Sequence, residues 1–422
     1  MSNQNAHKPG YKHTPLGWIP EEWEVKRMKD IAKVQGGYAF DSKKFATSGK
    51  FQVVKMSNVY NGNLNLERSA SYLNNLTRQE ENFLLKRNDI LITLTGTIGK
   101  RDYGYTYKIN GEENLVLNQR VARVIAKDGV ADPQYLAYEL KTNRLLDQFF
   151  FSARGGTGNQ ANVGTGDLEL VKVVTPSLPE QRKIATILST WDEAITKTQQ
   201  LIAQLQQRNK GLMQQLLKPK ADWESVHLGD VLKRITNGIT YDTDLKVGKP
   251  VSRIETISNG EIDFCKVGFC NKKNIEAFKM ESGDILYSHI NSLEHIGKVA
   301  FYDGKRELYH GMNLLLLRAN EETLSKFLYY WLKSDFGKKQ SKSFAKKAVN
   351  QASISSTEVK SFKISIPNKE VQLNIVEVLD ASVSEVKLYE QKLAALQQQK
   401  KGLMQKLLTG EVRVEGFVLS FL

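Results

Sequence analysis

The sequence lacks the features of membrane-embedded, secreted and metal-stabilised proteins. No apolar run approaches the roughly 18 residues that a helix needs to span a bilayer. Residues 1–11 are polar, without the apolar core of a signal peptide. The only cysteines, Cys265 and Cys270, have no second pair to complete a zinc site, and the six histidines show no metal-ligand spacing. We therefore expect a reduced, cytoplasmic protein with no membrane partner and no metal.

The sequence also has fewer acidic than basic residues. The 422 residues include 60 Lys and Arg but only 46 Asp and Glu, which gives a formal net charge of +14. A basic chain suggests a polyanionic partner, most simply nucleic acid. Many basic proteins bind nothing acidic, so charge alone leaves nucleic-acid binding open.

What the sequence does contain is an internal repeat. Segment 210–217 (KGLMQQLL) returns as 401–408 (KGLMQKLL), which is 191 residues later, and the same offset relates Asn-Gln-Ala at 159–161 to Asn-Gln-Ala at 350–352. Earlier parts repeat at offsets between 195 and 200, which indicates small insertions and deletions in loops. Each half is therefore a globular domain followed by a long helix.

The two long helices carry a heptad pattern. Apolar residues recur at alternating steps of four and three, which is typical of a coiled-coil seam. The seam residues are Ile184, Leu188, Trp191, Ile195, Ile202, Leu205, Leu212 and Leu216 in the first helix and Ile375, Leu379, Val386, Leu393, Leu396, Leu403 and Leu407 in the second. The seams match in register and length, and a domain separates them, so we expect antiparallel pairing. Two separate amphipathic helices, each packed on its own domain, are the alternative.

The predicted fold class is α+β. Short β-type runs alternate with turns in both domains, and each domain has one short helix, at 135–140 and 327–332. We expect two mixed α/β domains, separated by two long antiparallel helices that form a coiled coil, in a pseudo-two-fold internal repeat. The predicted boundaries are 1–178 for the first domain, 179–218 for the central helix, 219–366 for the second domain, 367–410 for the C-terminal helix and 411–422 for a tail.

The sequence contains no convincing catalytic motif. Residues 132–135 (DPQY) resemble the Asp/Asn-Pro-Pro-Tyr/Phe loop of amino-methyltransferases, but the second half has no counterpart. A structural interpretation fits better, with Asp132 as the N-cap and Pro133 as the first residue of a helix. No glycine-rich strand-to-helix segment indicates a methyl-donor site. We therefore expect no enzyme activity in this chain.

Basic and amide side chains in loops are the candidates for DNA binding. Arg and Lys bind phosphates or guanine edges, and Asn and Gln pair with adenine edges. Any one of them could instead be a solvated surface side chain. The candidates are Lys43, Lys44, Lys100, Arg101, Arg120, Arg154, Asn159 and Gln160 in the first half and Lys298, Asn313, Lys346, Lys347, Asn350 and Gln351 in the second.

The chain resembles the specificity subunits of type I restriction-modification systems over nearly its whole length. The resemblance rests on the domain openings 17–24 (GWIPEEWE) and Trp223-Glu224, the helix start 176–181 (PSLPEQ) and the Gly-Leu-Met-Gln-x-Leu-Leu helix ends. The second helix start, 366–372 (IPNKEVQ), departs from this pattern because it has an insertion and lacks Pro-Glu-Gln.

The resemblance implies a non-catalytic subunit of a restriction system for phage defence. Each domain, a target recognition domain, would read one half of an asymmetric bipartite site in double-stranded DNA. The helices would set the spacer and dock two methyltransferase (modification) subunits, and motor-nuclease (restriction) subunits would join. These partners would use S-adenosylmethionine, ATP and Mg, and this chain would bind no cofactor.

Two other functions compete with this one. A fused methyltransferase or nuclease would need an active site of its own. A coiled-coil scaffold would join protein partners without sequence-specific DNA binding.

Overall fold

The computed structural model divides the chain into two compact units. It describes residues 8–60, 62–155, 159–242, 244–258, 260–347 and 351–414, without the side chain of Lys347. Unit 1 comprises Met1–Lys197 and Leu393–Leu422, and unit 2 comprises Thr198–Lys392. Each unit holds one mixed α/β domain and one half of each long helix, so the boundary between the units cuts through both helices.

The domain of unit 1 is built on a four-stranded antiparallel sheet. Its order is β11 (Thr106–Lys108), β9 (Ile90–Thr93), β13 (Val121–Ala126) and β4 (Ala32–Gly36). Smaller sheets join β12 (Leu115–Leu117), β5 (Phe51–Val54) and β8 (Tyr72–Leu73), and β16 (Lys172–Thr175) with β3 (Glu24–Arg27). Two hairpins pair β1 (Tyr11–Thr14) with β2 (Gly17–Pro20) and β6 (Val59–Tyr60) with β7 (Asn63–Leu64). The helices are α1 (Met28–Ile31), α2 (Pro133–Glu139), α3 (Asn143–Phe151) and α4 (Thr165–Leu170).

The domain of unit 2 repeats this design with fewer small strands. Its four-stranded sheet has the order β18 (Leu232–Asn237), β24 (Leu315–Ala319), β21 (Ile285–Tyr287) and β23 (Val299–Phe301). Two-stranded sheets join β17 (Glu224–His227) with β27 (Lys363–Ile366) and β19 (Lys249–Val251) with β20 (Gly268–Cys270). The helices are α6 (Ser325–Lys333), α7 (Asp335–Phe344) and α8 (Ser356–Lys360). The α+β class predicted from the sequence is confirmed.

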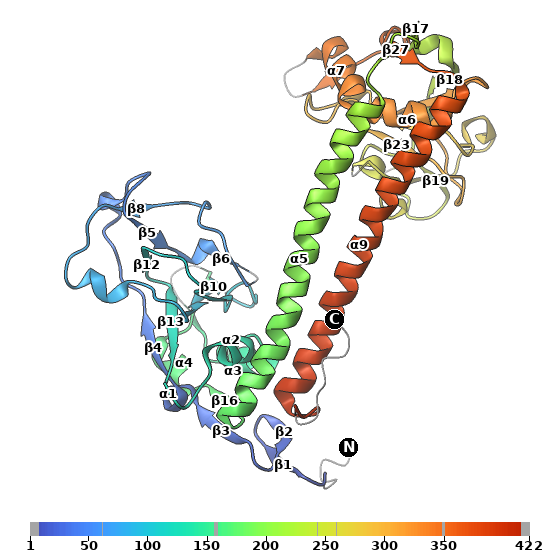
Figure 1. Cartoon of the computed structure of the whole chain (residues 1–422). Helices are drawn as coiled ribbons and strands as arrows, with labels where there is room; N and C mark the ends of the chain where they lie inside the picture. Colours follow the sequence, from blue (N-terminus) through green and yellow to red (C-terminus); the bar gives the residue numbers. More distant parts are fainter. Residues whose placement is uncertain are drawn as a thin grey trace. The chain divides into compact units, whose positions relative to one another are not determined.

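The two long helices, α5 (Leu178–Leu216) and α9 (Lys369–Thr409), lie side by side and antiparallel (Figure 1). In unit 1, Ile184 and Leu188 of α5 share one apolar cluster with Leu407 of α9. All the predicted seam residues are buried or half-buried. Helix α5 starts one residue before Pro179, not after it, because proline is tolerated in a first turn that has no intrahelical donors to lose.

Polar residues interrupt both seams, and two of them meet. In unit 2 the Nδ2 of Asn209 donates to the backbone oxygen of Ser382 at 2.7 Å, and Ser382 is buried. Asn209 is half-buried, and its bond to a backbone oxygen joins the two helices at this point of the seam. Two polar residues of the heptad patterns thus lie opposite each other in the paired helices.

A buried glutamine ties each long helix to the domain that precedes it. The side chain of Gln181 accepts from the backbone nitrogen of Asp132 at 2.9 Å and donates to the oxygen of Pro176 at 3.0 Å. In unit 2, Gln372 accepts from Leu324 at 2.8 Å and donates to Pro367 at 3.0 Å. The second helix start lacks Pro-Glu-Gln but keeps the glutamine, and both glutamines are 1% exposed.

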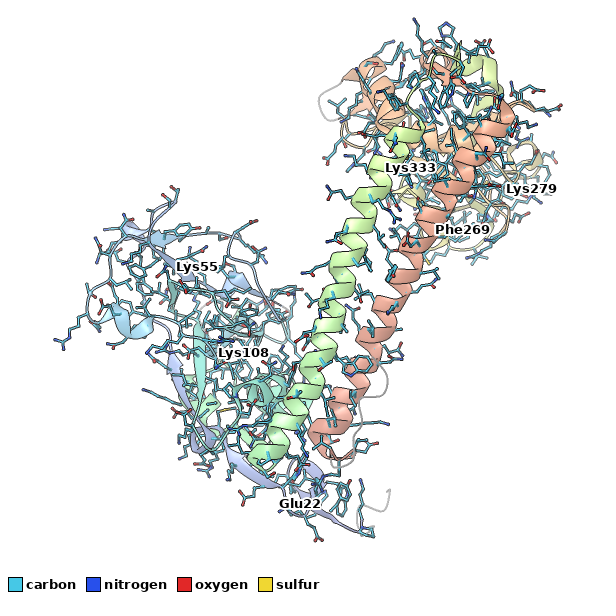
Figure 2. All side chains as sticks on the ribbon, in the orientation of Figure 1. Glu22, Lys55, Lys108, Phe269, Lys279 and Lys333 are labelled. Carbon is cyan, nitrogen blue, oxygen red and sulfur yellow. The ribbon has the colours of Figure 1, made fainter. Side chains whose placement is uncertain are left out.

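The residues that follow α9 contact the start of α5 and the first domain within unit 1. The Nε of Arg413 lies 3.0 Å from Glu180 Oε1, and the indole nitrogen of Trp23 donates to Glu180 Oε2 at 2.8 Å. Arg413 also pairs with Glu22, which Figure 2 labels near β2. The first domain thus meets the end of α9 through side chains, whereas in unit 2 the chain itself runs from α5 into the second domain.

An ion pair is buried at the same place in both main sheets. Arg123 of β13 lies 2.8 Å from Asp89, with side-chain exposures of 9% and 6%. The equivalent pair, 195 residues later, joins Arg318 and Asp284 at 2.7 Å. Removing one partner of a buried pair leaves an uncompensated charge, so these pairs are critical to the sheets.

We predict that Asp89→Ala lowers the free energy of unfolding of the first domain by about 3–5 kcal/mol, because it strands the Arg123 guanidinium. Faster hydrogen exchange in β9 and β13 would measure the loss. The matched control is Glu193→Ala, which removes an exposed pair with Lys197 at 3.8 Å and should cost well under about 1 kcal/mol. Equal effects of the two variants would contradict the assignment.

Candidate nucleic-acid interface

Each domain carries a second, three-stranded sheet with the same register, here called its hairpin sheet. In unit 1 the order is β10 (Thr95–Thr97), β15 (Gln160–Asn162) and β14 (Arg154–Gly155); in unit 2 it is β22 (Ile290–Asn291), β26 (Ala352–Ser353) and β25 (Lys346–Lys347). Ala161 pairs with Gly155 on one side, and Ala352 pairs with Lys347 in the same way. The Asn-Gln-Ala repeat therefore marks equivalent strands.

The register makes Arg154 and Lys346 equivalent, and each has an acidic partner. Arg154 lies 3.3 Å from Asp167, and Lys346 lies 2.8 Å from Glu358. The cations are 81% and 77% exposed, while both acids are 21% exposed. Among the described side chains, each hairpin sheet thus carries a solvent-facing cation that is paired with a less exposed carboxylate.

These acids are fixed by local structure. Asp167 and Glu358 are the third residues of α4 and α8, where their carboxylates accept from the backbone nitrogens of Gly164 at 3.2 Å and Ser355 at 2.8 Å. The ammonium of Lys346, with the Ser355 backbone and hydroxyl, lowers the pKa of Glu358 to about 2. Glu358 is therefore charged at neutral pH.

Two further candidates occupy an equivalent turn before the central strand of each main sheet. The turn follows a parallel bridge, Tyr38 with Asn118 in unit 1 and Ile239 with Gly311 in unit 2. Arg120 and Asn313 each lie two residues after the bridge. Arg120 is exposed and has a φ of 69°, and its backbone oxygen accepts from Leu94, next to β10.

The loop after β10 brings Lys100 and Arg101 to the first hairpin sheet. Asp102 closes this loop by accepting from the backbone nitrogen and hydroxyl of Thr97 at 2.8 and 2.7 Å, and these bonds lower its pKa. Lys100 is exposed. Arg101 is held by α3, with Asp147 at 2.6 Å and the Phe150 ring centroid at 5.0 Å.

The remaining candidates have different surroundings. Lys298 is half-buried and donates to the oxygen of Ser258 at 2.9 Å. Lys43 and Lys44 are exposed in a short helix, Ser42–Lys44, outside the hairpin sheet. Asn159, Gln160 and Gln351 lie in or beside the hairpin strands. The Lys347 side chain and the whole of Asn350 lie outside the described residues.

Sequence reasoning missed the acidic partners. Asp167 and Glu358 are related by the offset of 191, and this equivalence could have identified them as matching acidic residues. It did identify the role of Asp132, which caps α2 by accepting from Gln134 and Tyr135 at 2.9 Å, with Pro133 as the first helical residue.

The candidate site consists of cationic and amide side chains on and beside the strands of each hairpin sheet. An exposed ion pair contributes about 0–1 kcal/mol, so a phosphate can replace the carboxylate at little cost. Within the part of the chain that the structure describes, no cluster of His, Cys, Asp and Glu could hold a metal ion, and no helix is long and apolar enough to cross a membrane.

The sequence model of one protein family matches both halves of the chain. The family is the type I restriction modification DNA specificity domain, and the matches cover residues 20–207 and 220–398. The chain belongs to this family. The likeness noted in the sequence is thereby confirmed.

Relatives in the family include specificity subunits of archaea and bacteria. A protein named for the MjaX specificity subunit of Methanocaldococcus jannaschii is 43% identical over 194 residues, which is 44% of this chain and 46% of that protein. The MjaVIII specificity subunit of the same organism is 29% identical over 51% of this chain and 49% of its own length. The chain thus spans about half the length of these two relatives. The EcoKI specificity subunit of Escherichia coli is 20% identical over 85% of this chain and 82% of its own length.

Solved structures of this family share the fold. The S subunit of the type I system of M. genitalium has a TM-score of 0.54 at 17% identity and covers 91% of this chain and 96% of its own. A chain from a study of type I complex assembly and conformational transition has a TM-score of 0.59 at 18% identity, with 93% and 99% covered. Two α/β domains with paired long helices are therefore the family architecture.

Proposed function

We propose that this chain is the DNA-recognition subunit of a type I restriction-modification complex, and that each domain reads one half of an asymmetric bipartite site. The observation that carries the proposal is the equivalence of the two hairpin sheets. Arg154 and Lys346 occupy the same position with the same kind of acidic partner, Gln160 lies on the adjacent strand β15, and Gln351 immediately precedes the adjacent strand β26. A repeated arrangement of phosphate-binding and base-reading groups suits two readers on one duplex.

The long helices serve in this proposal as spacer and docking element. They would hold two methyltransferase subunits, which motor-nuclease subunits join, in the cytoplasm where the DNA lies. This chain would be non-catalytic, and S-adenosylmethionine, ATP and Mg would be used by the partners. Support comes from the relatives in the family, which are named as specificity subunits of type I restriction enzymes.

The two readers differ in sequence, so we predict a bipartite methylated motif with unequal half-sites. Sequencing of modified adenines in DNA from cells that carry this chain with its methyltransferase subunit would reveal the motif. A chain that supports methylation without sequence preference, or binds its partners but no specific DNA, would point to a scaffold instead. Methylation by the purified chain alone would point to an enzyme.

The cation of the second hairpin sheet gives a sharper test. Lys346→Ala should weaken DNA binding by the assembled methyltransferase and reduce the slope of log affinity against log salt by about 1, because one phosphate contact is lost. The control is Lys305→Ala, since Lys305 is also exposed and acid-paired, with Asp303 at 2.9 Å, but lies outside the hairpin sheet.

Glu358→Gln completes this set. It removes the charge that competes with phosphate for Lys346 while keeping an oxygen for the Ser355 backbone, so binding should tighten. An unchanged salt slope in Lys346→Ala, or the same decrease in Lys305→Ala, would remove Lys346 from the contacts.

The helix pair gives a test of the spacer. Inserting one heptad into both α5 and α9 adds about 10 Å of helix, which corresponds to about three base pairs at about 3.4 Å each. We expect the methylated motif to keep both half-sites and gain about three base pairs between them. Altered half-sites with an unchanged spacer would contradict the roles given to helices and domains.

A further inference from the structure

Both hairpin sheets have an exposed aliphatic side chain at an equivalent position. Ile98 is 47% exposed, and Leu293 is 37% exposed. Gly96 pairs with Ala161 in the first hairpin sheet, and Ile98 follows Gly96 by two residues.

The second hairpin sheet repeats this arrangement. Asn291 pairs with Ala352, and Leu293 follows Asn291 by two residues. Sequence matching alone would align Ile98 with Ile296 through the shared Ile-Gly-Lys, but Ile296 is only 4% exposed. The sheet register therefore identifies Leu293 as the exposed counterpart.

The surroundings of Ile98 place it among the candidate DNA-binding groups. Its backbone nitrogen donates to the oxygen of Asn159 at 3.1 Å. A Cβ on Gly155 would lie 3.9 Å from the Cδ1 of Ile98, so this side chain approaches β14 at Gly155, on the face opposite to the Arg154 side chain. The loop is held closed by Asp102, so Ile98 is presented by a fixed backbone.

Single exposed aliphatic side chains are normal on protein surfaces and need no explanation. Here two such side chains occupy one structural position in two domains whose sequences differ, and this recurrence calls for an explanation. In the major groove the apolar group that base pairs present is the C5-methyl of thymine. An exposed aliphatic side chain that adjoins a sheet with an exposed cation matches that surface.

We propose that Ile98 and Leu293 are specificity-determining residues, each contacting the methyl group of a thymine in the half-site that its domain reads. The inference rests on the proposed function and deepens it. Cations of the hairpin sheet hold the backbone of the duplex, and the aliphatic group that follows the first strand of the sheet distinguishes thymine from a pyrimidine that lacks the methyl.

The test uses the full chain assembled with its methyltransferase subunits and duplexes that carry the methylated motif. Each thymine is replaced in turn by deoxyuridine, which pairs identically but lacks the methyl. One replacement in each half-site should weaken wild-type binding about fourfold, the value of one buried methyl group. Ile98→Ala should bind the thymine duplex and the deoxyuridine duplex of its own half-site equally. It should retain the wild-type response to deoxyuridine in the other half-site. Leu293→Ala should show the reciprocal pattern.

Two exposed apolar residues outside the hairpin sheets serve as controls, Phe151 at 95% and Val247 at 80% exposure. Phe151→Ala and Val247→Ala should keep both deoxyuridine responses. The proposal is overturned if no deoxyuridine weakens wild-type binding, or if Ile98→Ala and Leu293→Ala keep the wild-type responses. A wild-type complex that selects no bipartite site would instead overturn the proposed function, and this inference with it.

Discussion

A buried side-chain amide couples each α/β domain to its long helix. Gln181 and Gln372 each satisfy backbone groups of the helix start and of the segment that begins the domain's short helix, at 2.8–3.0 Å. At 1% exposure no water can replace these bonds, and an unsatisfied buried polar group costs about 1–3 kcal/mol. Loss of the amide would therefore weaken the attachment of the domain to its helix.

Periodicity and repetition predicted the parts of the fold that local sequence controls. The heptad pattern predicted the two long helices, because the spacing of apolar residues along one helix is a local property of the sequence. The offset of 191 located the Asn-Gln-Ala strands for the same reason. The contact of Asn209 with Ser382 could not be predicted in this way, because it joins residues 173 apart in the chain.

The candidate site was harder to predict because its pairings cross loops of unequal length. Arg154 and Lys346 were selected for their charge, but their equivalence depends on strand register, which insertions between the copies conceal. For Arg123 it was burial that could not be predicted. The sequence shows a cation in a β-type run, and nothing in it indicates that this cation is buried against Asp89. Burial separates a structural guanidinium from one that is free to bind a phosphate.

The two hairpin sheets preserve a charge arrangement while exchanging the residues that make it. Arginine with aspartate in one domain and lysine with glutamate in the other keep a cation–carboxylate pair at one position, on acids that cap α4 and α8. Phosphates are the same along any duplex, so a phosphate contact constrains only charge and reach. Base edges differ, so the residues beside that contact are free to diverge with the sequence being read. An ion pair that recurs in both domains, next to residues that differ between them, is therefore the pattern expected if the pair holds the DNA backbone and its neighbours select the base sequence.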